Sequence, residues 1–503
     1  MMNAKEKVVK NSFLYVFSSI LMKGFGFILL PIYTYFLTPE DYGTINLLNG
    51  FINIMVFIVA LSLYAAIIRF YVDYKKDHQK LKRFHGTVFL FILISGMSFL
   101  ILSLVFNDVI LQLFFKNITF FPIIFIALLS ITFIAIHTMH YNVLMAMQNG
   151  PKAVTINVIF FLLQAGMNIL FITVFDLGAI GIMLSQLILN VMYFWFAIFD
   201  LKKYDLIVIC MDLKILKEVL KYSIPIIPHN LSTRIASLIS KLFLNSSNSL
   251  ALVGIYSVSL QFGMLIDTIQ VAVNKAFKPW FFEMLEDQSE NNKTEIVNLT
   301  KVLLICYSVV YMIIGLFSQD VIVLLINDQY ITAWTIIPIF VFGFSIKSLY
   351  YFYANILFYY KDASKKIFIG TIIGSTSNIM FAALLIPLYG MYGGAISFVI
   401  SKVITVVIVV IISKKYPFDG YKVFDMLKVI LTSMTFMLLG LLFSYSKYDT
   451  EFDVGNFLYK FLVLGSYMAL VYIWYKPLIK SFLTVDWIKH NLRKNQTNIN
   501  RKD

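Results

Sequence analysis

A chain of 503 residues that is 60% hydrophobic and only 14% charged does not have the composition of a soluble protein. Soluble domains are about 45–50% apolar and about 25% charged, so this composition indicates a polytopic membrane protein. The net charge of +14 would suggest a nucleic-acid partner in a soluble chain, but the positions of the cations give another explanation.

Fourteen apolar stretches are long enough, at about 20 residues or more, to cross a bilayer as helices. The basic N-terminus runs into the first of them without a small-residue cleavage site, so we expect an uncleaved first span. The predicted fold class is therefore an all-α polytopic membrane protein with 14 transmembrane helices. Their approximate bounds are 11–36, 43–70, 86–106, 119–146, 153–175, 178–199, 222–245, 250–274, 299–318, 334–359, 366–386, 391–413, 424–446 and 456–475.

The cations lie almost entirely on one side of this predicted topology. With the N-terminus inside, the inner segments hold 32 of the 41 Lys and Arg residues, and the outer segments hold Lys116, Lys447 and Lys460. This is a strong positive-inside pattern, which places both termini in the cytoplasm. The cations would face the anionic lipids of the cytoplasmic leaflet, so the net charge does not require a nucleic-acid partner.

An internal repeat divides the chain into two similar halves. The pattern G-x-x-G-x-x-x-S occurs at Gly178 and Gly181 and again at Gly390 and Gly393, and Gly43 and Gly254 open two further spans at nearly the same offset. These glycines allow tight turns and close helix contact. We expect two six-helix lobes as parallel pseudo-twofold repeats with two extra C-terminal helices. The predicted parts are the N-terminal lobe (1–200), a cytoplasmic linker (201–221), the C-terminal lobe (222–413), two extra spans (414–475) and a basic amphipathic cytoplasmic tail (476–503).

Charged residues inside the predicted spans are the candidate functional residues. A charge at the bilayer centre costs at least about 2.5–3.5 kcal/mol, and Asp267 is the one acid clearly within a span. Most of the cations therefore have no acidic partner, and we expect the central ones to face a water-filled substrate pathway. Two cations nearer span ends could instead extend to the interface. The central cations are Lys23, Arg234, Lys347 and Lys402, and those nearer span ends are Arg69 and Lys241.

Other residues in these spans have more than one interpretation. Asp267 is a candidate for proton or sodium coupling, or it neutralises Arg234. Pro225 and Pro228 interrupt the start of the span at 222–245, and His229 beside them would bond the freed backbone or contact cargo. A pair of histidines three residues apart, His137 and His140, is interpreted as interior and satisfied. No catalytic nucleophile, metal-binding or nucleotide-binding motif is present, so neither a catalytic site nor a cofactor is expected.

Two stretches carry a resemblance to a known family: LPIYTYFLTPEDYGTINLLN at the exit of the first span and YSIPIIPHNLS at 222–232. The chain resembles the bacterial polysaccharide repeat-unit flippases, which export O-antigen and capsule units. Their superfamily includes the multidrug and toxin extrusion proteins and the peptidoglycan-precursor flippases.

The resemblance implies alternating access in the inner membrane. Undecaprenyl-pyrophosphate-linked oligosaccharides would move from the inner to the outer leaflet, driven by an H⁺ or Na⁺ gradient, with a polysaccharide polymerase and a chain-length regulator as partners. Lys23 departs from the drug-extrusion relatives, many of which carry a cavity acid in the first span, and so favours an anionic cargo. The alternatives are an ion-coupled multidrug or small-molecule antiporter of the same fold and a non-transporting scaffold for a polymerase.

The predicted topology can be tested by thiol labelling in a variant with Cys210 and Cys306 replaced by Ser. A membrane-impermeant maleimide should label Lys447→Cys in intact cells and should label Lys203→Cys only after permeabilisation, because the two positions lie on opposite sides. The reverse pattern of labelling would contradict the predicted orientation.

Overall fold

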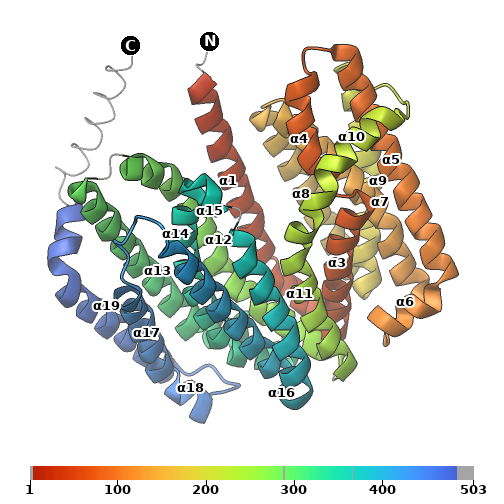
Figure 1. Ribbon diagram of the computed structural model, residues 1–503. Coiled ribbons are helices and arrows are strands. Elements are labelled where there is room, and N and C mark those ends of the chain that lie inside the picture. The colour runs from red at the N-terminus through yellow and green to blue at the C-terminus, as the bar shows by residue number, and fades with distance from the viewer. Residues whose placement is uncertain (1–3, 248, 287–288, 365, 484–503) are drawn as a thin grey trace. The chain divides into compact units, whose positions relative to one another are not determined.

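A computed structural model of the protein describes residues 4–247, 249–286, 289–364 and 366–483. All regular structure in these residues is helical, with no strand (Figure 1). The predicted all-α class is therefore confirmed for the described part of the chain.

The helices of the first half follow one another with short connections. They are α1 (Ala4–Ile28), α2 (Leu30–Phe36), α3 (Pro39–Val59), α4 (Leu63–Tyr74), α5 (His78–Val105), α6 (Asn107–Phe114), η1 (Phe120–Ile124), α7 (Phe125–Ala146), α8 (Gly150–Thr173), α9 (Gly178–Lys203), α10 (Leu213–Ser223) and η2 (Ile224–Ile226).

The second half contains longer helices. They are α11 (Ile227–Ser247), α12 (Leu250–Glu286), α13 (Glu290–Leu325), η3 (Asp328–Ile336), α14 (Ile337–Tyr359), α15 (Lys361–Ser364), α16 (Ile367–Ser413), α17 (Val423–Gly440), α18 (Leu442–Ser446) and α19 (Val454–Leu483).

The chain forms two compact units. The first unit consists of Met1–Gln261, Leu325–Ile336 and Phe368–Ile404, and the second consists of Phe262–Leu324, Ile337–Ile367 and Thr405–Asp503. Within the first unit, α7 packs against α3, α4, α5 and α9 and forms its centre. The six-helix lobes predicted from the repeat are not tested by this division and stay a prediction. The predicted tail lies outside the described residues from 484 onward.

Twelve helices in the described residues are long and apolar enough to cross a membrane, so the protein is a multi-pass membrane protein. The sequence predicted fourteen spans, and two positions account for the difference. The predicted span at 222–245 corresponds mainly to α11, which is not among the twelve and carries Arg234 and Lys241. The predicted spans at 366–386 and 391–413 together correspond to α16.

The helix α16 is a hairpin of two helical halves. Gly390 interrupts its 47 residues with a left-handed backbone, φ 54° and ψ −129°. The Ser401 hydroxyl donates a hydrogen bond of 2.8 Å to the Gly374 carbonyl oxygen, although residues 27 apart would be about 40 Å apart along a straight helix. The chain therefore reverses direction between them. Each half is long enough to cross a bilayer, while the total of fourteen spans stays a prediction.

Gly178, like Gly390, has a positive φ. Its φ is 53°, and it begins α9 after the short connection from α8. Just beyond these turns, a Cβ atom added at Gly181 would lie 3.0 Å from Phe171 Cβ, and one added at Gly393 would clash with the Leu385 carbonyl oxygen. Both G-x-x-G motifs thus lie where two consecutive helical segments meet, which supports the predicted repeat without testing its extent.

The starts of α3 and α12 meet backbone against backbone. Thr38 and Asp41 form a capping box that begins α3. A Cβ atom added at Gly43 would clash with the Leu250 carbonyl oxygen, and one added at Gly254 would clash with the Pro39 carbonyl oxygen. These clashes are reciprocal at a constant offset in the sequence, which is the pattern produced by a local two-fold axis.

The loop after α9 is held against the start of α5. The Val208 amide donates to the Lys82 carbonyl oxygen at 3.3 Å, and His85 Nδ1 lies 2.9 Å from the Leu206 carbonyl oxygen. The Lys82 ammonium and His78 pair with Asp205 and hold the pKa of its carboxyl below the usual range. This part of the predicted 201–221 linker is therefore attached to the first unit.

Replacing Gly390 with Ala should destabilise the protein, because a residue with a side chain is strained at this backbone conformation by about 1–3 kcal/mol. Thermal unfolding of the purified protein should show a lower midpoint for Gly390→Ala. Gly166→Ala is the matched control, since a Cβ atom there meets nothing within 4 Å. An unchanged midpoint in Gly390→Ala would contradict the required reversal.

Candidate functional site

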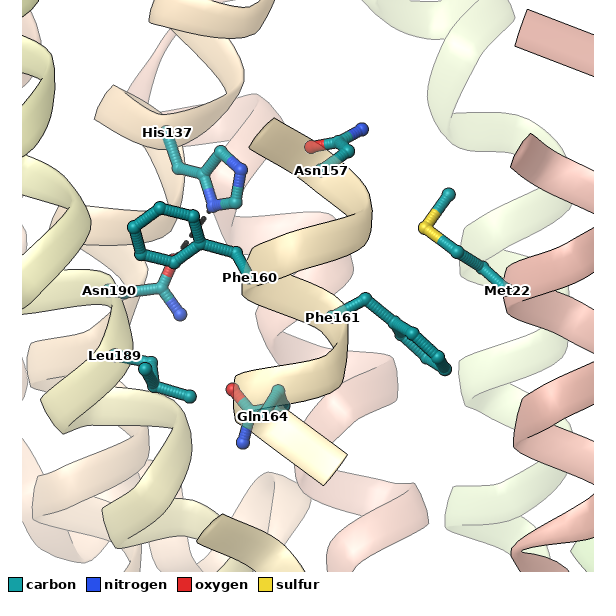
Figure 2. Close-up of a pocket in the computed structure, with 8 residues that line it drawn as sticks. All are labelled: Met22, His137, Asn157, Phe160, Phe161, Gln164, Leu189 and Asn190. Atoms are coloured by element: carbon teal, nitrogen blue, oxygen red, sulfur yellow. Dashed lines mark hydrogen bonds between the residues drawn. The ribbon is translucent and has the colours of Figure 1, made fainter. Parts of the chain in front are cut away.

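A cavity of about 230 Å³ lies among four helices of the first unit, α1, α7, α8 and α9. Figure 2 shows four side chains projecting from α8 and Met22 of α1 opposite Phe161. The lining residues are Met22, His137, Asn157, Phe160, Phe161, Gln164, Leu189 and Asn190. We call this cavity the α8 pocket.

The α8 face of the pocket follows from helical spacing. Asn157, Phe160, Phe161 and Gln164 recur at intervals of three or four residues, so they lie on one side of the helix. Gln164 Nε2 donates to Asn168 Oδ1 at 2.8 Å and also to a serine on α9. These bonds hold the amide in place at the wall of the pocket.

Amide groups, an imidazole and phenyl rings line the pocket. His137 Nδ1 lies 3.2 Å from Asn190 Oδ1, and its ring stacks on Tyr193 with centroids 3.6 Å apart. Asn, Gln and His side chains can donate and accept hydrogen bonds, and phenyl faces accept apolar ring surfaces. This lining suits a neutral polar ligand. The pocket was not predicted from the sequence, although amide side chains at helical spacing in an apolar span were a usable signal.

Two of the predicted pathway cations belong to α1 and α11 of the first unit. Lys23 follows the pocket residue Met22, is exposed, and forms no ion pair among the described residues. The Arg234 guanidinium lies 4.4 Å from the centroid of the Phe57 ring, a cation–π contact. Lys23 has no ion pair among the described residues and the ring of Phe57 does not neutralise Arg234, so the charge of each cation is available to an anion.

Lys241 is buried in the first unit. Its ammonium donates to the Asn46 carbonyl oxygen at 3.2 Å and to Asn46 Oδ1 at 3.4 Å. The interpretation that Lys241 extends to the membrane interface is therefore wrong, because the ammonium is satisfied inside the protein. Arg69 on α4 is exposed and forms an ion pair of 2.6 Å with Asp73, one helical turn away.

Asp267 pairs with Lys347, and both belong to the second unit. Lys347 Nζ lies 2.7 Å from Asp267 Oδ1, and the Tyr351 hydroxyl donates to the same oxygen at 2.8 Å. The sequence assigned no particular acidic partner to Lys347 and offered Arg234 as one possible partner of Asp267. In the structure Asp267 pairs with Lys347, because α12 and α14 bring together residues 80 positions apart.

The other predicted site residues lie in α16, η2 and α11. The Lys402 ammonium on α16 lies 4.7 Å from the centroid of the Phe398 ring. Pro225 lies in the single turn of η2, before α11. Pro228 and His229 belong to α11, but their side chains lie outside the described residues. Among the described residues there is no group of three His, Cys, Asp or Glu side chains that could hold a metal ion.

The buried ion pair of Lys460 and Asp320 was not predicted from the sequence, because both residues were assigned to positions outside the membrane spans. Lys460 was assigned to an outer segment, but it lies in α19, fully buried, with its ammonium 2.7 Å from Asp320 Oδ2 and 2.6 Å from Gln319 Oε1. Asp320 lies within α13, beyond the predicted end of that span at residue 318. The count of one acid within the spans is therefore too low.

Comparison with known proteins identifies the family. The family described as polysaccharide biosynthesis protein matches residues 8–285, which is more than half of the chain. The chain belongs to this family. A relative, Lsg locus putative protein 1 of Haemophilus influenzae, is 22% identical over 364 residues, covering 70% of this chain and 85% of the relative. The resemblance stated from the sequence is confirmed.

Solved structures show which fold the family member adopts. The lipid II flippase MurJ in an inward closed conformation has a TM-score of 0.69 and 19% identity, with 94% of this chain and 100% of that chain covered. An inward-facing multidrug resistance MATE transporter of the MOP superfamily has a TM-score of 0.58 and 16% identity, and the match covers 81% of this chain and 95% of that chain. The chain has the fold of these membrane transporters.

The buried pair in the second unit leads to a stability prediction. Lys460→Met should lower the thermal unfolding midpoint, because an unpaired buried carboxylate costs about 3–5 kcal/mol, and the double variant Asp320→Leu/Lys460→Met should recover most of the loss. Lys447→Met, at an exposed lysine, is the control. Equal midpoints for Lys460→Met and Lys447→Met would show that the pair contributes nothing.

Proposed function

We propose that this protein is a flippase that moves undecaprenyl-pyrophosphate-linked oligosaccharide repeat units from the inner to the outer leaflet of the bacterial inner membrane. The observation that carries the proposal is membership of the polysaccharide biosynthesis family. The fold similarity to a lipid II flippase supports it, because that protein is named for acting on a lipid-linked cargo. A transporter needs no catalytic residues, and the sequence contains no catalytic motif.

The cargo would be recognised by its charge and by its sugars. Lys23 and Arg234, two cations of the first unit that form no ion pair among the described residues, are the proposed contacts for the pyrophosphate. Arginine binds phosphate in a bidentate way, whereas lysine acts as a point charge. Lys402 is a third candidate, while Arg69, Lys241 and Lys347 already have partners that weaken their claim.

The proposed mechanism is alternating access of two six-helix lobes. Reciprocal contact of Gly43 and Gly254 and the positive φ shared by Gly178 and Gly390 support a twofold repeat. An H⁺ or Na⁺ gradient is the proposed energy source. Because Asp267 is paired with Lys347, an ion binding there would compete with the lysine. A polymerase, a chain-length regulator and anionic lipids are the proposed partners.

A multidrug or small-molecule antiporter is the second candidate, because MATE transporters share the fold. Cationic drugs are disfavoured by the unpaired cations Lys23 and Arg234, since like charges repel. An anionic small molecule would meet the same residues, and the assay of lipid-linked intermediates distinguishes the two cargoes.

The test is an assay of lipid-linked intermediates in a strain that lacks the protein. We expect undecaprenyl-linked repeat units to accumulate on the cytoplasmic leaflet and the surface polymer to disappear. Wild-type protein should restore export, and Lys23→Gln/Arg234→Gln should restore at most about one tenth of it if each lost charge-assisted contact costs about 1 kcal/mol or more.

Lys447→Gln, which removes an exposed lysine, is the control and should restore export fully. Normal lipid intermediates and normal surface polymer in the deletion strain would contradict the proposed cargo and would favour the antiporter. Full export by a correctly inserted Lys23→Gln/Arg234→Gln variant would contradict the proposed role of these two cations.

A further inference from the structure

Directly behind the α8 pocket, a histidine is enclosed by a tyrosine, a carboxylate and a lysine from two neighbouring helices. His140 of α7 is fully buried, and its Nδ1 lies 2.9 Å from the Tyr193 hydroxyl. Its Nε2 lies 3.1 Å from Asp200 Oδ2, and Lys152 Nζ lies 2.6 Å from both oxygens of Asp200. Tyr193 and Asp200 are also at least nine-tenths buried.

We propose that His140, Asp200, Lys152 and Tyr193 form a proton-binding site in the first unit, with His140 Nδ1 as the atom that takes the proton. Nothing in the proposed transport of lipid-linked cargo assigns a role to these residues. The inference rests on the proposed function only in treating the proton as a coupling ion, and proton binding itself can be measured without cargo.

The hydrogen bonds determine where the proton goes. An ionised carboxylate can only accept, so the neutral ring carries its hydrogen on Nε2 and donates it to Asp200, while Nδ1 accepts from the Tyr193 hydroxyl. When a proton binds Nδ1, the Tyr193 hydroxyl must rotate and accept from the imidazolium. The site then changes its net charge from zero, with Lys152 and Asp200 opposed, to +1.

The proton site lies beside the α8 pocket, near the start of α8 and the end of α9. Tyr193 stacks on the pocket residue His137, so rotation of its hydroxyl occurs next to the pocket wall. Lys152 is 20% exposed at its side chain, near the start of α8, and reaches toward the surface. The site therefore connects a ligand cavity to the basic end of α8 and α9, which the charge distribution places in the cytoplasm.

Other titratable groups around His140 set its electrostatic environment. His85 of α5 and His137 of α7 interact with it electrostatically, and like charge on either opposes its protonation. The acids of α3 are confined to its first turn, and Arg69 and Asp73 of α4 pair with each other. Tyr141 of α7 interacts with Tyr193, and Tyr71 of α4 stacks on His85. The other tyrosines of the packed helices are Tyr42 of α3 and Tyr64 and Tyr74 of α4.

The experiment follows histidine nitrogens by ¹⁵N NMR in purified full-length protein in lipid nanodiscs between pH 5 and 8. The His140 signals are assigned by their loss in His140→Gln. We expect them to titrate with one midpoint in the wild-type protein. His78→Gln, which removes an exposed histidine that pairs with Asp205, is the control and should keep the His140 titration.

Two substitutions should move the His140 midpoint in opposite directions. Asp200→Asn removes the charge that favours imidazolium and leaves the Lys152 charge unopposed, so the midpoint should fall by about one pH unit or more. Lys152→Gln removes the competing cation, so the midpoint should rise. A purely structural hydrogen-bond network would not produce this pair of opposite shifts.

His140 signals that stay constant from pH 5 to 8 in the wild-type protein would overturn the proposal. A titration whose midpoint is the same in Asp200→Asn and Lys152→Gln would also overturn it, because His140 would then titrate independently of the site. Neither outcome depends on the cargo. Failure of the flippase proposal would appear separately, as normal lipid intermediates in the deletion strain.

Discussion

The hydrocarbon core of a membrane offers no water to a charged or polar group, and this constraint accounts for much of the structure. Backbone groups are satisfied within helices, which is why the described residues contain no strand. Buried side-chain charges need partners, and here two such pairs form between helices. Lys460 with Asp320 and Lys347 with Asp267 both join residues of separate helices at 2.7 Å. Each pair therefore also specifies how its helices pack.

The two pairs differ in how much water they can reach. Lys460 and Asp320 are almost completely buried. By contrast, 24% of the Lys347 side chain and 22% of the Asp267 side chain are exposed. A buried pair has little freedom to exchange partners, because either charge alone would be costly. A partly exposed pair can exchange a partner for an ion or a ligand. The first pair is therefore structural, and the second is the better candidate for a functional role.

In the first unit, polar residues gather on α7, α8 and α9. The α8 pocket presents amides, an imidazole and phenyl rings, and the His140 network lies behind it, linked through the stacked rings of His137 and Tyr193. This arrangement places a site suited to neutral polar groups beside one suited to a proton. The cations Lys23 and Arg234 lie on other helices of the same unit, α1 and α11, and form no ion pair among the described residues.

The sequence alone determined the membrane class, the family resemblance and the glycine motifs, because hydropathy, charge bias and local spacing are properties of short stretches. It also indicated which cations would be costly in a membrane. Only the tertiary structure decided that Lys347 pairs with Asp267, that Lys460 is buried, and that Asp200 meets His140 and Lys152. These contacts join residues 48 to 140 positions apart. They depend on how helices pack, which local sequence patterns do not encode.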